Sequence, residues 1–185
     1  LYSYWLTKNY RDSYKIFASN GILFNHESPL RGETFVSRKI TMNVAKRFMG
    51  VNEKLYLGNI YSKRDWGHAK DYVVAMWKML QQKKPNDYVI ATGYQYSVKQ
   101  FVNLCAKKLK MNIIWRGKGL NEKCYWNKKV IIEIDKKYFR PTEVESLKGD
   151  FRKAKKMLKW KPKISFDDLI VKMVESDLEN INNPK

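Results

Sequence analysis

Residues that could bind an anion recur in this sequence just after the predicted strands. They are Asn25, Arg31, Lys39, Arg64 and Arg140. Arginine presents a planar fork of N–H donors that matches two phosphate oxygens, and lysine and asparagine add further donors. In open α/β sheets, ligands lie beyond the carboxyl ends of the strands, where these residues fall. Each residue alone is also consistent with a surface salt bridge, but the recurring set predicts one diphosphate held by several loops.

Three further polar residues lie beside this set. Glu143 follows Arg140 closely and could accept hydrogen bonds from ribose hydroxyls. His26 could serve as a general base, although a lone histidine at a strand end is more often structural or a cofactor contact. Glu27 is expected either to stabilise His26 or to stay solvated. No nucleophile has an adjacent base in this sequence, so we predict a binding site whose chemistry is incomplete.

The stretch 20–39 carries the densest group of these residues. Its apolar run at 22–24 predicts a short buried strand. A loop shaped by proline and glycine follows, and Thr34 is expected to cap a helix that begins near Phe35. A helix N-terminus with cations nearby suits a phosphate, so the local elements favour the same ligand class.

The remaining chain alternates short apolar strands with amphipathic helices, which predicts an α/β protein. Ser97 and Gln100 have the spacing of a capping box, and His68 is expected to pack at the start of a helix. The polar segment 116–127 is expected to be a loop. Strands are predicted at 55–57, 88–91, 113–115 and 130–134, and helices over 1–20, 35–49, 72–80, 98–109, 151–159 and 166–178.

Composition narrows the class of protein. The chain has 185 residues, of which 44% are hydrophobic, so it can bury a core. Cys105 and Cys124 stand apart without a clustered partner, which indicates reduced thiols in a cytoplasmic protein and no metal site; Cys105 falls on a helical stripe and is expected in the core. No apolar run approaches the roughly 20 residues that cross a bilayer, so no membrane partner is expected.

The net charge of +19 raises one alternative from a different class, a basic nucleic-acid-binding module. The lysines are scattered over every segment, however, and no nucleic-acid-binding motif accompanies them. We therefore expect no nucleic-acid partner. The apolar stripe of the first predicted helix is already present at Leu1 without a capping residue, so an upstream portion of the protein is also expected.

Several long motifs resemble one known family. They are NGILFNHESPLRGETFVSRKIT at 20–41, LYLGN at 55–59, RDWGHAKDYV at 64–73, VIATG and YSVKQFV around Gly93, and YFRPTEVESLKGD at 138–150. Together they resemble the GDP-mannose 4,6-dehydratase family of extended short-chain dehydrogenase/reductases, over nearly the whole chain. Leu30 departs from the family pattern, which has a second arginine there.

This resemblance implies the fold and its division. The chain would be the C-terminal part of an extended Rossmann-type fold plus a small α/β substrate-binding lobe, without the N-terminal dinucleotide-binding part. The last elements of the Rossmann sheet would lie at about 1–27 and 52–93, and the lobe at about 28–51 and 94–185. The catalytic residues of the family would lie upstream of Leu1, so none is expected in this chain.

The resemblance also implies roles for individual residues. Leu23, His26 and Arg31 match positions on the NADP side, and Arg31 lies on a loop associated with subunit assembly into a homodimer or homotetramer. The positions that match the GDP-mannose side are Asn25, Val36, Lys39, Gly58, Arg64, Arg140 and Glu143.

The implied reaction of the intact enzyme is an internal redox reaction. A hydride leaves the hexose C4 for NADP, water leaves across C5 and C6, and the hydride returns to C6, which gives GDP-4-dehydro-6-deoxy-D-mannose. This chain alone would bind and orient the nucleotide sugar without turnover. Another nucleotide-sugar epimerase or dehydratase of the superfamily, or a degenerate non-catalytic relative, stays an alternative.

Overall fold

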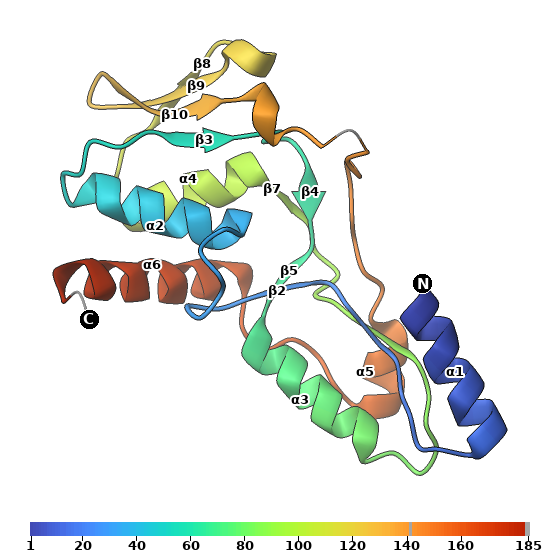
Figure 1. Ribbon diagram of the computed structural model, residues 1–185. Helices are drawn as coiled ribbons and strands as arrows, with labels where there is room; N and C mark the ends of the chain where they lie inside the picture. The colour runs from blue at the N-terminus through green and yellow to red at the C-terminus, as the bar shows by residue number, and fades with distance from the viewer. Residues whose placement is uncertain (141, 184–185) are drawn as a thin grey trace.

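The computed structural model describes residues 1–140 and 142–183. One part of it is a four-stranded sheet that lies on three helices (Figure 1). Its strand order is β3-β10-β9-β8. β3 and β10 are parallel, whereas the pairs β10–β9 and β9–β8 are antiparallel. The elements are β3 (Leu55–Leu57), β10 (Lys129–Ile134), β9 (Lys123–Trp126), β8 (Ile114–Arg116), α2 (Val36–Phe48), α4 (Val98–Lys108) and α6 (Phe166–Asn182).

The other part is built on two parallel strands (Figure 1). Their flanking helices are α1, α3 and α5, and two short strand pairs, β2 with β5 and β4 with β7, connect this part to the first. The elements are β1 (Gly21–Leu23), β6 (Tyr88–Ile90), α1 (Tyr2–Tyr14), α3 (Ala69–Leu80), α5 (Arg152–Leu158), β2 (Asn25–Glu27), β5 (Trp66–His68), β4 (Lys63–Arg64) and β7 (Tyr96–Ser97). Two 3₁₀ turns, η1 (Gly119–Asn121) and η2 (Lys136–Tyr138), lie beside the four-stranded sheet, between β8 and β9 and after β10.

Two apolar cores hold these parts. The larger lies between the four-stranded sheet and its helices, where Trp66 packs edge-on against Phe101 and parallel to Phe166. The smaller lies between α3, β6 and α5, and its large side chains are Tyr72, Tyr88 and Trp160. Burial of such aromatic side chains is the main favourable contribution to folding, so each part has its own source of stability.

The predicted α/β class is confirmed by this mixture of parallel strands and helices. The predicted division at 27, 51 and 93 stays a prediction. β3, assigned in sequence to the Rossmann part, pairs with β10, and α5, assigned to the lobe, packs on α3 and β6. Within 1–140 and 142–183, no helix is both long and apolar enough to cross a bilayer.

Local expectations were met at some positions and wrong at others. The capping box of Ser97 and Gln100 is present in full, and Cys105 is a fully buried core residue. Thr34 does not cap α2, whose N-cap is Phe35 without a side-chain hydrogen bond. The expected loop 116–127 contains β9, and the first helix ends at Tyr14 rather than near residue 20.

His68 caps α3 as well as packing at its start. Its Nδ1 accepts a hydrogen bond of 3.1 Å from the backbone N–H of Lys70. Burial lowers the pKa of His68, which keeps the imidazole neutral and able to accept this bond.

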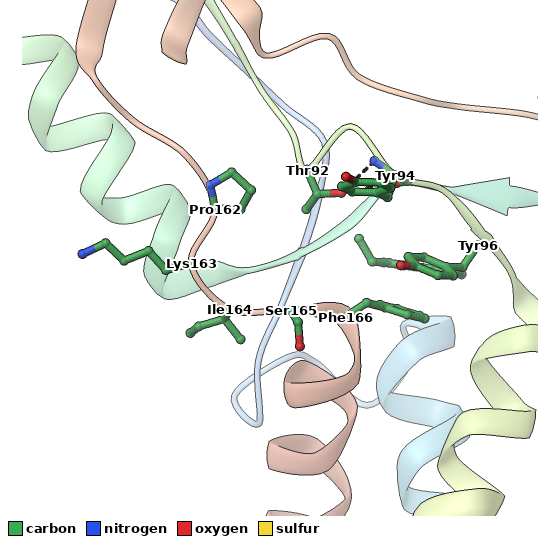
Figure 2. A pocket seen from close by; sticks show the side chains of 9 residues that line it. Thr92, Tyr94, Tyr96, Pro162, Lys163, Ile164, Ser165 and Phe166 are labelled. Carbon is green, nitrogen blue, oxygen red and sulfur yellow. Dashed lines mark hydrogen bonds between the residues drawn. The ribbon is translucent and has the colours of Figure 1, made fainter.

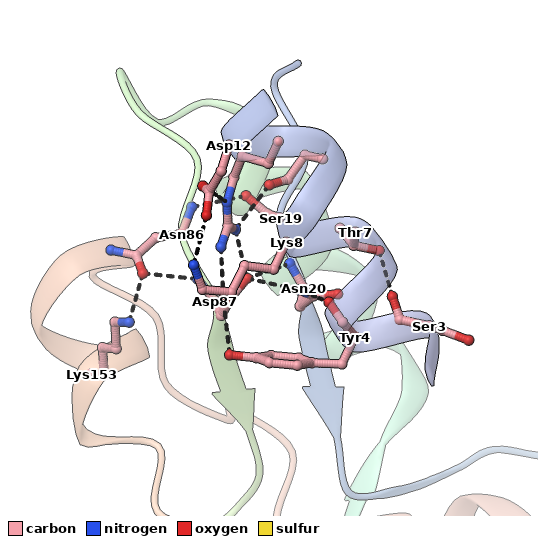
Figure 3. Close-up of polar contacts among 12 residues, drawn as sticks. Ser3, Tyr4, Thr7, Lys8, Asp12, Ser19, Asn20, Asn86, Asp87 and Lys153 are labelled. Atoms are coloured by element: carbon pink, nitrogen blue, oxygen red, sulfur yellow. Dashed lines mark hydrogen bonds and ion pairs between the residues drawn. The ribbon is translucent and has the colours of Figure 1, made fainter. Parts of the chain in front are cut away.

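None of the residues of helix α1 is buried, so polar contacts hold this helix against the rest of the chain. Arg11 donates hydrogen bonds of 2.7 and 3.0 Å to the two carboxylate oxygens of Asp87, and Tyr4 Oη donates one of 3.2 Å (Figure 3). The backbone and side-chain N–H groups of Asn20 donate to the same carboxylate at 3.0 Å. Asp87, which directly precedes β6, thus joins α1 to Asn20, which directly precedes β1.

Replacing Asp87 by asparagine should destabilise this attachment in a pH-dependent way. Hydrogen bonds from Arg11 and Asn20 hold the pKa of Asp87 well below its ordinary value of about 3.9. A depressed carboxylate pKa contributes stability above the unfolded-state pKa, and that contribution is lost as the pH falls through the folded-state value. We expect the free energy of unfolding to fall by about 1 kcal/mol at pH 7 and the difference to shrink below about pH 4.

Urea unfolding of both forms between pH 3 and pH 7 measures this difference. Asp12→Asn is the matched control, because Asp12 lies on the same helix, its own side chain is 56% exposed, and its short ion pair of 2.6 Å is with Lys8 near the surface, so its replacement should change little. A constant difference across the pH range would contradict the assigned cause.

Candidate functional site

A cavity of about 490 Å³ lies where β2, the start of α2, the end of β3, β4 and the segment after β10 meet. Its lining residues come from stretches more than 100 residues apart in the sequence. All seven positions predicted for the substrate line it: Asn25, Val36, Lys39, Gly58, Arg64, Arg140 and Glu143. The structure therefore brings these residues together around one hollow, and their roles in binding stay predictions.

The described lining of this cavity is strongly cationic. Arg31, Lys39, Arg64 and Arg140 contribute positive charges, whereas Glu143 contributes a negative charge. Unlike exposed lysines on a convex surface, these cations share a concave wall, which concentrates their field on one volume. The cavity is thus suited to a ligand that carries more than one negative charge.

Lys39 is held at the wall by two neighbours. Its Nζ donates a hydrogen bond of 2.9 Å to the backbone carbonyl of Tyr56 and lies 4.1 Å from the centroid of the Tyr138 ring. A cation over an aromatic face is attracted by the ring, so Tyr138 helps to hold the ammonium. This pairing joins α2, β3 and η2 at one side of the cavity.

Arg64 joins β4 to the segment that follows η2. Its Nη1 donates hydrogen bonds of 2.7 Å to the carbonyl of Val144 and 2.9 Å to that of Lys63. Its Nη2 lies 3.1 Å from Glu143 Oε1. Glu143 is therefore already paired with Arg64. A ribose hydroxyl that donates a hydrogen bond to Glu143 must share the carboxylate with Arg64.

Gly58 is required by a close approach of two backbones. A Cβ atom at this position would lie 2.3 Å from the carbonyl oxygen of Tyr138, far inside a normal contact. The end of β3 and η2 therefore meet without a side chain between them, which defines one wall of the cavity.

A second cavity of about 320 Å³ adjoins the first. Leu23, His26 and Arg31, the three positions predicted for the cofactor, line it together with Ile22, Phe24, Asn25 and Leu147. Asn25 and Arg31 line both cavities. The two predicted sets of residues therefore lie in two neighbouring hollows that share a border.

His26 is oriented by its neighbours. Its Nδ1 lies 2.8 Å from the carbonyl oxygen of Phe24, and its ring stacks on that of Tyr72 at 5.2 Å between centroids. Because a carbonyl oxygen can only accept, Nδ1 is the donor of this hydrogen bond and carries a proton. The ring of His26 is thus held in place by Phe24 and Tyr72, which favours a residue that contacts a ligand over one that moves to carry a proton.

Both expectations for Glu27 were wrong. Its carboxylate is only 2% exposed, so it is not solvated, and it contacts Ser37 and Arg31 rather than His26. Side chains alternate in direction along a strand, so neighbours such as His26 and Glu27 point to opposite faces.

Sequence reasoning missed several other lining residues. Tyr138 had a signal, because it begins the polar cluster that contains Arg140 and Glu143. Residues such as Ser62 had none, since a serine after a strand is common in any loop. The missed residues of the larger cavity are Thr34, Phe35, Tyr56, Leu57, Asn59, Ser62, Val98 and Tyr138.

A third hollow, of about 290 Å³, lies near the start of α6 (Figure 2). One side of it is aromatic, with the rings of Tyr96 and Phe166 stacked at 3.9 Å between centroids and Tyr94 beside Tyr96, and Pro162 to Ser165 lie across from them. None of the residues predicted for a ligand lines it. The residues predicted for a ligand thus line the first two cavities.

Comparison with known proteins places the chain in a family. The family model described as GDP-mannose 4,6 dehydratase matches residues 1–173. The GDP-mannose 4,6 dehydratase of Dictyostelium discoideum is 56% identical over 184 residues, which are 98% of this chain and 52% of that protein. The Homo sapiens protein of the same name is 53% identical over 181 residues, 97% of this chain and 49% of that protein. The chain spans about half the length of these relatives.

Solved structures share the fold at low identity. RMD from Pseudomonas aeruginosa, complexed with NADPH, superposes with a TM-score of 0.75 and 16% identity over 94% of this chain and 52% of its own. The dTDP-glucose 4,6-dehydratase of Bacillus anthracis, in complex with NAD, gives a TM-score of 0.75 and 18% identity over 97% and 50%. The architecture is therefore that of a partial extended Rossmann-type fold, and by its family match the chain belongs to the GDP-mannose 4,6 dehydratase family.

Proposed function

We propose that this chain is the substrate-binding, C-terminal half of an NADP-dependent GDP-mannose 4,6-dehydratase, a hydro-lyase. The observation that carries the proposal is the convergence of Asn25, Lys39, Arg64 and Arg140 on one cavity. Four separate elements supply these residues, and a diphosphate is the ligand whose two charged groups they could hold together. The relatives named for this activity support GDP-mannose as the nucleotide sugar.

The second cavity fits a nicotinamide cofactor. Apolar side chains of Ile22, Leu23 and Leu147 offer a surface for a flat ring, and Arg31 at the border offers a cation for a phosphate. When bound, NADP would supply reversible hydride acceptance. The residues of this chain would hold the hexose beside that cofactor and exclude water from the border of the two cavities.

The remaining parts of the proposal concern the intact enzyme. Its catalytic acid, base and tyrosine would lie in the other half of the protein, so the 185-residue chain alone should show no turnover. A homodimer or homotetramer in the cytoplasm is also proposed, because the family resemblance implies it. NADP is proposed because the family resemblance implies it; the fold neighbours hold NADPH in P. aeruginosa RMD and NAD in the B. anthracis dehydratase, which supports a nicotinamide cofactor of either kind.

Binding measurements on the intact enzyme test this function. Calorimetric titration should show GDP-mannose binding more tightly than UDP-glucose or dTDP-glucose, and turnover should release GDP-4-dehydro-6-deoxy-D-mannose. Preference for a uridine or thymidine sugar would instead support an epimerase or another dehydratase of the superfamily. Tight, salt-sensitive binding of DNA or RNA without any nucleotide-sugar binding would support the basic nucleic-acid module and contradict the proposal.

A further inference from the structure

A buried carboxylate lies beneath the border of the two cavities. Glu27, the last residue of β2, is 2% exposed. Burying a charge is costly unless it is paired, so a buried Glu27 needs hydrogen-bond donors or a cation in contact with its carboxylate. One carboxylate oxygen, Oε2, receives a hydrogen bond of 2.6 Å from Ser37 Oγ and lies 3.1 Å from Arg31 Nε.

Arg31 is oriented from two sides by these contacts. The guanidinium carbon lies 3.6 Å from the centroid of the Phe35 ring, so the group is stacked flat on an aromatic face. Its Nε is buried and makes no hydrogen bond of good geometry among the described residues, so the contact with Glu27 is an ion pair. Within 1–140 and 142–183, the terminal nitrogens of Arg31 also make no hydrogen bond to the protein.

The loop that carries Arg31 is fixed from its other side as well. Arg38, in the first turn of α2, donates a hydrogen bond to the carbonyl of Pro29 and forms an ion pair of 2.9 Å with the buried Asp177 of α6. The backbone N–H of Arg31 donates to the carbonyl of Ser28 at 3.0 Å. The backbone is thus held independently of Glu27, which leaves the side chain of Arg31 as the part that Glu27 controls.

We propose that Glu27 is a positioning residue that holds the Arg31 guanidinium at the border of the two cavities, with its terminal nitrogens directed to an anionic phosphate of the cofactor. This inference rests on the proposed function. A side chain held before binding loses less freedom when the ligand arrives, so the ion pair raises affinity through orientation rather than through contact with the ligand. Ser37 is the hydroxyl that keeps Glu27 in place.

The test is a double-mutant cycle on the intact enzyme, with NADPH affinity measured by fluorescence titration. Glu27→Gln keeps the size of the side chain and the acceptor for Ser37 but removes the charge. We expect the Kd for NADPH to rise about 2- to 10-fold, which is the cost of immobilising one flexible side chain. In an Arg31→Met background the same substitution should leave the Kd unchanged, because Glu27 acts through Arg31.

Two controls separate positioning from a loss of fold. Asp65→Asn removes a second fully buried carboxylate, which accepts from Thr92 and from the backbone N–H groups of Gly93 and Gly149; it should lower the Tm without changing the Kd for NADPH. If Glu27→Gln does not fold, Ser37→Ala replaces it in the same cycle and should give a smaller rise in Kd.

The outcomes distinguish this inference from the function on which it rests. Failure of the unaltered enzyme to bind NADPH overturns the proposed function. Binding by the unaltered enzyme together with an unchanged or lower Kd in Glu27→Gln overturns the positioning role alone. A rise in Kd that persists in the Arg31→Met background also overturns it, because the effect would then be a general loss of structure.

Discussion

Replacing Arg64 by methionine is expected to weaken GDP-mannose binding by about 10- to 100-fold, the loss typical of hydrogen bonds made by a charged group. Methionine keeps much of the apolar stem and removes the guanidinium. The substitution removes a cation from the cavity wall and also breaks the contacts with the carbonyl of Val144 and the carboxylate of Glu143. Glu143 would then be left as an uncompensated negative charge beside an anionic ligand.

Calorimetric titration of the intact enzyme measures this loss. Arg116→Met is the matched control, because Arg116 is an exposed cation on β8 that does not line either cavity. Both substitutions lower the net charge by one, so a purely long-range effect of charge would weaken binding equally in both. Equal Kd values in the two variants would contradict the site.

Replacing Gly58 by alanine should reduce both stability and GDP-mannose affinity. The new Cβ would overlap the carbonyl oxygen of Tyr138 at 2.3 Å, so the backbone of η2 must move away from β3. Such overpacking costs about 1–3 kcal/mol of folding free energy. The ring of Tyr138 also holds the ammonium of Lys39, so a displaced η2 should displace Lys39 as well. We expect the affinity for GDP-mannose to fall more than about tenfold, because the cost to binding should be of the same order as the cost to folding.

Gly117→Ala is the control for Gly58→Ala. A Cβ at Gly117 would lie 2.3 Å from the carbonyl oxygen of Asn121, the same overlap in a loop that lines neither cavity. Both variants should therefore show a lower Tm, and Gly58→Ala alone should show a higher Kd for GDP-mannose. If a folded Gly58→Ala enzyme kept its affinity for GDP-mannose, the wall formed by the end of β3 and η2 would not be part of the binding site.

The sequence predicted the elements best where one local pattern decided the structure. Ser97 and Gln100 satisfy each other across one helical turn, so their spacing alone predicts the start of α4. The segment of β9 could not be predicted in this way. Its residues Lys123 to Trp126 are mixed in polarity, and they form a strand because β10 and β8 supply backbone partners on both sides.

The site shows the same limit. Motifs and the resemblance identified the residues of both cavities, although β2, β3 and β4 belong to three different sheets and Asn25, His26 and Arg64 lie within strands rather than after them. They could not identify pairs such as Arg64 with Glu143 or Glu27 with Arg31 and Ser37. Those pairs depend on how loops fold over one another, which hydrophobic periodicity does not describe. The wrong expectation that Thr34 caps α2 has a different cause, because a capping residue type indicates a helix start only within a few positions.

The pairing of β3 with β10 has a consequence for the order in which the protein folds. Leu55 lies opposite Ile132, so 77 residues of chain separate the two partners. Forming such a distant contact requires closure of a long loop, which slows folding relative to local contacts. During synthesis, β3 therefore stays without this partner until β10 has been made. The larger cavity is walled by β3 and by the segment that follows β10, so it can form only after this pairing, and ligand added during refolding should report that step.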